Sequence, residues 1–154
     1  MAIATVADIV PLVDENRTII KYGLKRIHGG NRLGLSGLIR EIGLDEKTIN
    51  AGRIAFVIGP HINAGGRVDT ANAALELLQE TDPEKIQGLA EQLIYNNNLR
   101  KSLQQEGYEM AREAVGENPK DHILIISGKN IHEGIAGIVA GKLKEEFYRP
   151  VLVV

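Results

Sequence analysis

The chain contains no cysteine and no tryptophan, and its aromatic side chains amount to four tyrosines and two phenylalanines among 154 residues. The lack of cysteine excludes disulfide bonds, a thiolate nucleophile and cysteine-ligated zinc or iron–sulfur sites. It is compatible with a reducing compartment, and we expect a cytoplasmic protein. So few aromatic rings argue against a nucleic-acid binder that depends on base stacking alone.

Long hydrophobic runs and an excess of one charge are also missing. No apolar stretch approaches the roughly 20 residues that a membrane span needs, and no secretory signal is evident, so no membrane partner is expected. A net charge of −2 argues against a non-specific coat on DNA but leaves room for a local basic pocket. The 44% of hydrophobic residues predicts a packed core.

Glycine, by contrast, is abundant at 17 residues. The chain begins and stops in apolar sequence, at Met1–Val10 and Arg149–Val154. Natural termini are more often polar and poorly ordered, so both ends predict a segment of a longer protein.

Apolar residues recur at helical spacing over most of the chain. We expect glycine-rich, irregular structure at His61–Arg67, because Gly59-Pro60 interrupts the pattern. Two helices are predicted over residues 16–27 and 35–42. A third should begin at a cap formed by Asp45 or Thr48 and end at Gly59-Pro60. A fourth should begin at a cap formed by Asp69 or Thr70 and continue through residue 78.

A long helix is predicted next. Asp82-Pro83-Glu84 combines an N-cap, a proline in the first turn and an acidic residue near the positive end of the helix. No proline follows before about Val115, although Asn96–Asn98 could introduce a kink. About thirty residues at 1.5 Å each exceed what a small core needs, which favours a helix that connects two lobes.

The last part of the chain predicts a β–loop–α–β unit. His122–Ser127 is a continuous apolar strand of the kind that is buried on both faces, and Pro150–Val154 is a second strand. The helix between them spans residues 135–147, so the strands should pair in parallel. The fold class expected is mainly helical α/β.

Two segments could bind anions, and a carboxylate could bind a cation. Asp8 lies in apolar sequence, where it is either a metal ligand or a surface or capping residue. Gly59–Arg67 could hold a phosphate with its backbone and Arg67, or be a plain connector. Ser127–Gly134 lies between a strand and a helix, where α/β proteins bind ligands, or it is an ordinary loop.

A complete catalytic set is not evident. The sequence has no nucleophile-elbow motif, and His132-Glu133 has no further partner at metal-ligand spacing. The remaining histidines, which are His28, His61 and His122, show no zinc spacing either.

Three segments in this order resemble the RecJ family of DHH phosphoesterases, which are bacterial single-strand-specific 5′→3′ DNA exonucleases. They are Thr5–Leu12, Gly59–Arg67 and His132–Ala140, and Glu15–Leu24 and Tyr148–Pro150 add to the resemblance. The resemblance implies that residues 1–81 are the end of a DHH catalytic lobe and that 82–117 are a long connecting helix. Residues 118–154 would begin the DHH-associated lobe. The motif that names the family would precede Met1.

The resemblance also implies roles for single residues. Asp8 would be one ligand of a two-metal centre of Mn²⁺ or Mg²⁺. Two departures from the family pattern are His61, where arginine is frequent, and Gly66, where alanine is usual. The residues implied in DNA or phosphate binding are His61, Asn63, Arg67, Ser127, Lys129, His132 and Gly134.

The expected function is that of a fragment of a metal-dependent exonuclease acting in DNA repair and recombination, with single-stranded DNA as its partner. We expect the chain alone to be inactive and to bind no metal, because one aspartate cannot hold two ions. It could self-associate through apolar surface on the helical front part of the chain, which lacks the sheet that it should pack on. Two alternatives are a DHH phosphoesterase for short oligonucleotides, cyclic dinucleotides or pyrophosphate, and a non-catalytic nucleic-acid-binding or scaffold module.

Overall fold

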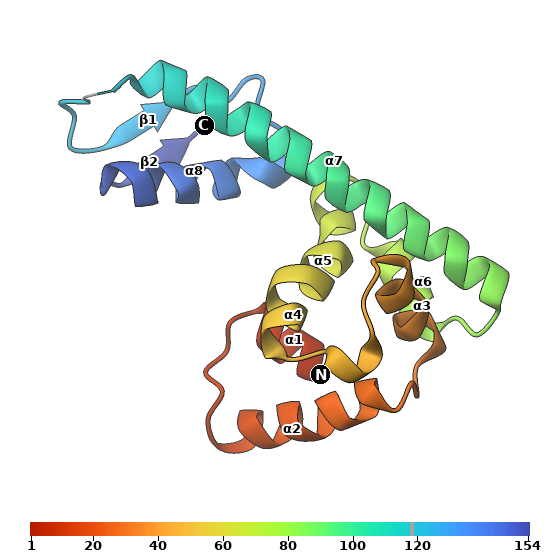
Figure 1. Cartoon of the computed structure of the whole chain (residues 1–154). Coiled ribbons are helices and arrows are strands. Elements are labelled where there is room, and N and C mark those ends of the chain that lie inside the picture. Colours follow the sequence, from red (N-terminus) through yellow and green to blue (C-terminus); the bar gives the residue numbers. More distant parts are fainter. Residues whose placement is uncertain (118) are drawn as a thin grey trace. The chain divides into compact units, whose positions relative to one another are not determined.

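The computed structural model describes residues 1–117 and 119–154 and confirms a mainly helical α/β fold with a parallel pair of strands (Figure 1). The chain forms two compact units. Unit 1 comprises residues 1–65 and 69–97, and unit 2 comprises residues 66–68 and 98–154. Asn118, at which the predicted third segment begins, lies outside the described residues.

Unit 1 begins with three helices. The apolar start of the chain forms α1 (Ala2–Ala7), to which the sequence analysis assigned no structure. The two helices α2 (Asp14–His28) and α3 (Leu33–Glu41) lie where apolar spacing predicts them. Acidic residues in the first turn of α2 and basic residues in its last turn complement the helix dipole.

The next stretch is helical through the predicted break. A 3₁₀ turn, η1 (Glu46–Thr48), precedes α4 (Ala51–Arg53), the π-helical turn η2 (Ile54–Ile58) and α5 (Gly59–Val68). The predicted interruption at Gly59-Pro60 and the irregular segment at His61–Arg67 are therefore wrong. Asp45 caps only η1, and Asn50 caps α4, so the predicted helix start at Asp45 or Thr48 is also wrong.

The π-helical turn explains why Pro60 does not end the helix. The N–H of Gly59 bonds to the carbonyl of Ile54, five residues back. A proline in a regular helix clashes with the carbonyl four residues earlier, and the wider turn makes room for the ring.

The helix α6 (Asn72–Gln79) follows without a side-chain cap. Ala71 occupies its N-cap position, so the prediction of a cap at Asp69 or Thr70 is wrong. Asp69 instead ends α5, where its N–H donates to the carbonyl of Gly65. Asp69 therefore caps the end of α5, although the sequence pattern predicted it as a cap at the start of α6.

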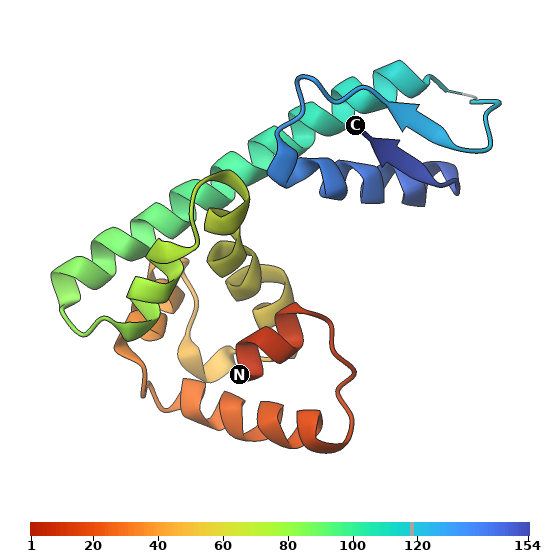
Figure 2. The ribbon, with the colours of Figure 1, turned by 180° about the vertical axis from the view of Figure 1, so that it is seen from behind.

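The long helix α7 (Pro83–Val115) has 33 residues. Its start is capped as predicted, because the N–H of Glu84 donates to Asp82 Oδ1 at 3.0 Å. The helix is uninterrupted at Asn96–Asn98, where the sequence suggested a kink (Figure 2). Residues of α7 up to Asn97 belong to unit 1 and those from Asn98 belong to unit 2.

The core of unit 1 consists of two apolar clusters. The Cα of Gly34 faces the backbone of Leu77, and an added Cβ would lie 1.6 Å from the Leu77 carbonyl oxygen, so α3 and α6 are in main-chain contact. One cluster contains Val6, Ile20, Ile27, Leu35, Ile39, Ile49, Ile54 and Ile58, and the other contains Leu38, Ala73, Ala74, Leu77, Ile86, Ala90 and Leu93.

Unit 2 is built on the predicted parallel strand pair. The strands β1 (Leu124–Ile126) and β2 (Val151–Val153) pair with Leu124 opposite Val151, and α8 (Glu133–Phe147) lies between them in the chain. The core of this unit contains Ala111 from α7, Ile126 from β1, and Ile135, Val139 and Leu143 from α8.

The strand prediction was wrong in one respect: only one face of the sheet is covered. Leu124 and Ile126 are buried, whereas Ile125 on β1 and Leu152 on β2, which pair with each other, are 68% and 53% exposed. Ile123 and Val154 extend this outward face. Within the described residues, helices pack on the opposite face alone, so the apolar run does not become a fully buried strand.

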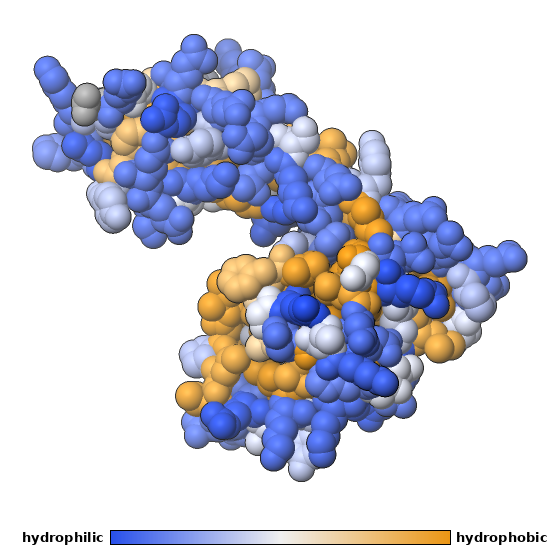
Figure 3. Space-filling view, in the orientation of Figure 1, coloured by the Kyte–Doolittle hydropathy of each residue, from blue (hydrophilic) through white to orange (hydrophobic). Residues whose placement is uncertain are grey.

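Apolar residues are also exposed on unit 1. Figure 3 shows hydrophobic surface among hydrophilic side chains there. Ile9, Val13 and Phe56 are 87%, 58% and 84% exposed. Among the described residues, no helix is both long enough and apolar enough to cross a membrane.

Candidate nucleic-acid and metal-binding residues

Two of the predicted residues, Asp8 and Asn63, line the same cavity in unit 1. Asp8 terminates α1 and its N–H donates to the carbonyl of Ala4 at 2.9 Å, while Asn63 is exposed on α5. The two helices approach closely, because an added Cβ on Gly59 would lie 3.0 Å from the Ala7 side chain. The cavity encloses about 750 Å³.

The cavity wall carries charges of both signs. Asp8 contributes a carboxylate, and Arg26 from α2 and Arg32, which precedes α3, contribute guanidinium groups. Most of the remaining lining is apolar. An exposed aspartate at the carboxyl end of a helix adds to the negative partial charge there, and this arrangement attracts cations.

The described residues do not form a complete metal centre. No group of three or more His, Asp or Glu side chains among them is arranged to hold an ion. Mg²⁺ and Mn²⁺ prefer several oxygen ligands, and the exposed Asp8 can supply one carboxylate. Asp8 therefore contributes one exposed carboxylate to this cavity.

His61 faces the interior of unit 1. It is 9% exposed, with Nδ1 2.8 Å from the Val57 carbonyl oxygen and Nε2 3.1 Å from Asn97 Nδ2. With the proton on Nδ1, the ring donates to the carbonyl and Nε2 accepts from the Asn97 amide. In this structure His61 joins α5 to α7 inside unit 1.

The partner of His61 was not among the predicted residues. Asn97 is fully buried and lies four residues after the buried Leu93, on the core side of α7. A polar residue at an apolar position of a helix is the sequence signal for a buried hydrogen-bonded pair. The signal was present, but its partner on α5 could not be found from spacing.

Arg67 and Gly134 meet within unit 2. Arg67 Nη1 donates to the Gly134 carbonyl at 3.3 Å. An added Cβ on Gly134 would lie 1.9 Å from the Arg67 carbonyl oxygen, so the backbones of α5 and α8 touch. The guanidinium of Arg67 is thereby held at the first turn of α8.

His132 and Gly134 shape the start of α8. His132 is the N-cap, and its Nδ1 accepts from the N–H of Gly134 at 3.2 Å. The resemblance implied Gly134 in DNA binding, and in the structure its N–H is engaged within the protein. Gly134 serves close backbone packing here, and His132 serves as a cap.

Ser127 and Lys129 are exposed in the loop between β1 and α8. The N–H of Gly128 donates to the Val154 carbonyl, and the N–H of Ile131 donates to the Gly128 carbonyl at 2.7 Å. These bonds hold the loop at the carboxyl end of β1, the edge at which α/β proteins bind ligands.

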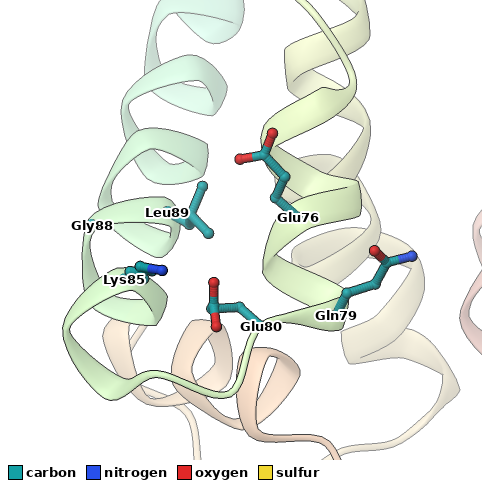
Figure 4. A pocket seen from close by; sticks show the side chains of 6 residues that line it. All are labelled: Glu76, Gln79, Glu80, Lys85, Gly88 and Leu89. Atoms are coloured by element: carbon teal, nitrogen blue, oxygen red, sulfur yellow. The ribbon is translucent and has the colours of Figure 1, made fainter.

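A separate groove between α6 and α7 contains none of the predicted residues. It encloses about 570 Å³, and Figure 4 shows Glu76 and Glu80 on one side and Lys85 and Leu89 on the other. Backbone N–H groups of Asp82 and Thr81 donate to Glu80 and lower the pKa of its carboxyl group. The Glu80 carboxylate therefore stabilises the turn before α7.

The fold and these residues define a mainly helical α/β protein segment in which Asp8 and Asn63 line one cavity and Arg67 is held at the first turn of α8. No family model matches the chain.

The curated relatives are single-stranded-DNA-specific exonucleases named RecJ. The protein of Bacillus subtilis is 39% identical over 153 residues, which cover 99% of this chain and 20% of the relative. The proteins of Thermus thermophilus and Escherichia coli are 34% and 33% identical, with 99% of this chain and 22% and 27% of the relatives covered. The chain thus spans about a fifth to a quarter of the length of these relatives.

Solved structures agree with this match. The crystal structure of RecJ from Thermus thermophilus in complex with Mg²⁺ gives a TM-score of 0.87 at 34% identity, over 99% of this chain and 24% of that chain. A crystal structure of exonuclease RecJ bound to manganese gives 0.86 at 34% identity, over 99% and 38%. The chain is therefore similar to one segment of RecJ proteins in both sequence and fold.

Proposed function

We propose that this chain is part of a cytoplasmic, metal-dependent exonuclease that degrades single-stranded DNA from its 5′ end during DNA repair and recombination. The observation that carries the proposal is the match to RecJ proteins over 99% of the chain in both sequence and fold. Two further observations support the proposal. Asp8 is exposed in unit 1, and the Arg67 guanidinium in unit 2 bonds to the Gly134 carbonyl.

The proposal assigns the chain to three parts of the longer enzyme. Residues 1–81 complete the catalytic lobe, residues 82–117 form the connecting helix, and residues 118–154 begin the DHH-associated lobe. Asp8 supplies one ligand to Mn²⁺ or Mg²⁺, which activates water and stabilises the phosphodiester oxygens when bound. The remaining ligands come from other parts of the enzyme, so this chain alone is inactive.

The phosphate contacts come from exposed polar side chains. Asn63 and Arg67 are four residues apart on α5, and Ser127 and Lys129 lie in the loop before α8. Contacts to phosphates position a strand without selecting its sequence. In this proposal His61, His132 and Gly134 act by shaping α5 and the start of α8, since their polar groups bond within the protein.

The test uses the longer enzyme with 5′-phosphorylated single-stranded DNA and Mn²⁺. Changes to groups around a metal ligand cost 10–100-fold, so we expect Asp8→Ala to lower the rate of nucleotide release by at least about 100-fold. Asp121→Asn, at an exposed aspartate of unit 2, is the control and should stay near wild type. The 154-residue chain should release nothing under the same conditions.

Other outcomes would contradict specific parts of the proposal. Near-wild-type activity of Asp8→Ala would remove Asp8 from the metal centre. Cleavage of dinucleotides or pyrophosphate, with the long strand left intact, would keep the family and change the substrate. If the longer protein bound DNA without any metal-dependent hydrolysis, a binding or scaffold module would replace the exonuclease.

A further inference from the structure

In unit 2, α7 and α8 lie side by side and run in the same direction (Figures 1 and 2). An added Cβ on Gly107 of α7 would lie 3.3 Å from the Val139 side chain of α8. Further along both helices, Tyr108 Oη donates to Glu146 at 2.6 Å and Arg112 Nε donates to Glu146 at 2.8 Å. Residue numbers therefore rise together along the two helices.

This register brings Arg100 to the start of α8. Arg100 precedes Gly107 by seven residues, which is about two turns, so both residues lie on the face of α7 that packs on α8. Gly134 precedes Val139 by five residues on α8, about 7.5 Å along its axis. Arg100 and Gly134 thus lie on the same side of the Gly107–Val139 contact.

Arg67, on α5, also lies at the start of α8. Its backbone lies against Gly134, and its guanidinium donates to the Gly134 carbonyl. Arg100 donates to Gln104 Oε1 at 2.9 Å, which orients its side chain along α7. The Arg67 guanidinium is therefore held at the amino end of α8, and the helix register brings Arg100 toward the same end.

The two cations influence each other. Burial lowers the pKa of Arg100, and the positive charge of Arg67 lowers it further. Within the described part of the chain no ion pair involves Arg67. Two like charges held near a helix start, which is itself partly positive, repel one another, and a bound anion relieves that repulsion.

We propose that Arg67 and Arg100 together bind one phosphate of single-stranded DNA. The proposal rests on the proposed function for the identity of the ligand. Guanidinium groups present forks of N–H donors that match phosphate oxygens, and two of them from separate helices fix the orientation of the phosphate. Arg100 is thus a second phosphate-binding residue, beside the Arg67 that the sequence pattern indicated.

The experiment measures binding of a fluorescein-labelled thymidine oligonucleotide to the 154-residue chain by anisotropy over a range of salt concentrations. Loss of one charge-assisted contact should weaken binding about tenfold in Arg67→Gln and in Arg100→Gln. Each variant should also reduce the slope of log K against log salt by about 0.7, the value for one phosphate contact on a single strand.

Three further variants sharpen the test. The double variant should bind about as weakly as either single variant, because the two arginines share one phosphate. Arg100→Lys should keep the salt slope and lose part of the affinity, since lysine lacks the fork. Lys101→Gln removes the same charge from the next, exposed position of α7, and it should change affinity less than about twofold.

Three other results would contradict the shared site, the DNA ligand or the whole inference. Wild-type affinity and slope in Arg100→Gln would overturn the shared site and leave the proposed function intact. If the chain ignored the oligonucleotide but bound pyrophosphate in a way that needed both arginines, the two-arginine site would stand and DNA as its ligand would fall. No binding of either probe by a chain with a normal thermal unfolding transition would overturn the inference.

Discussion

At the scale of the residue, Gly134 is constrained by what touches it. Its Cα faces the main chain of Arg67, and the space that a methyl group would need is occupied by a carbonyl oxygen. Gly137, one turn later on α8, faces open space. Glycine is therefore required by close packing at position 134 of α8 and is not required by packing at position 137.

We expect Gly134→Ala to lower the free energy of unfolding by about 1–3 kcal/mol, since the backbone of α5 or α8 must move. Gly137→Ala is the matched control and should raise it by about 0.5–1 kcal/mol, because alanine has the higher helix propensity. Urea unfolding followed by circular dichroism measures both. Equal effects of the two substitutions would contradict the close contact at Gly134.

Glu146 gives a second prediction at this scale. Hydrogen bonds from Tyr108 and Arg112 lower the pKa of its carboxyl group below the ordinary value of 4.5. A carboxyl group with a lower pKa in the folded state stabilises the protein above the unfolded pKa, and this contribution is lost as the pH falls through the folded value. Because the group is exposed, the effect is small.

Glu146→Gln should therefore lower the melting temperature slightly at pH 7, and the difference from wild type should disappear in acid below the folded pKa. Glu145→Gln, at the adjacent exposed position, should show no such pH dependence. A difference between wild type and Glu146→Gln that persisted unchanged into acid would show that charge is not its cause.

At the scale of the element, local signals predicted α7 well and α5 poorly. Asp82, Pro83 and the apolar repeat all act within a few residues, so the start of α7 follows from the sequence. The π-helical turn before α5 ends at Gly59, which packs against Ala7 of α1, a residue far away in the chain. Spacing rules contain no information about such a contact, and they read Gly59-Pro60 as a break.

The cap of α7 can be tested directly. Asp82→Ala removes the acceptor for the N–H of Glu84 and should cost about 1 kcal/mol of unfolding free energy. Asp82→Ser keeps an acceptor at the same position and should recover most of the loss. The check is chemical denaturation of the three proteins, and equal stability of the alanine and serine variants would contradict capping by this side chain.

At the scale of the whole molecule, the sheet of unit 2 has an uncovered apolar face. Ile123, Ile125, Leu152 and Val154 are each more than half exposed. An apolar sheet face of this kind favours contact with another protein surface. For the 154-residue chain on its own, we propose that a second copy makes this contact.

Sedimentation of the isolated chain should accordingly show association that increases with concentration. Ile125→Thr keeps a β-branched residue while reducing the apolar surface, and it should weaken the association. Phe56→Ser removes an exposed apolar side chain from unit 1 and is the control. A monomer at all concentrations, or an equal effect of both substitutions, would rule out self-association through this face.

The sequence alone determined the mainly helical α/β class, the cap and length of α7, the parallel pairing of β1 with β2, and the similarity to RecJ. These depend on periodicity, caps and motif order, which act over short distances in the chain. Only the tertiary structure decided that Gly59-Pro60 lies within a helix, that one sheet face is exposed, and that His61 pairs with Asn97. It also decided that Arg67 lies against Gly134 at the start of α8, because such proximity comes from packing between helices that are distant in sequence.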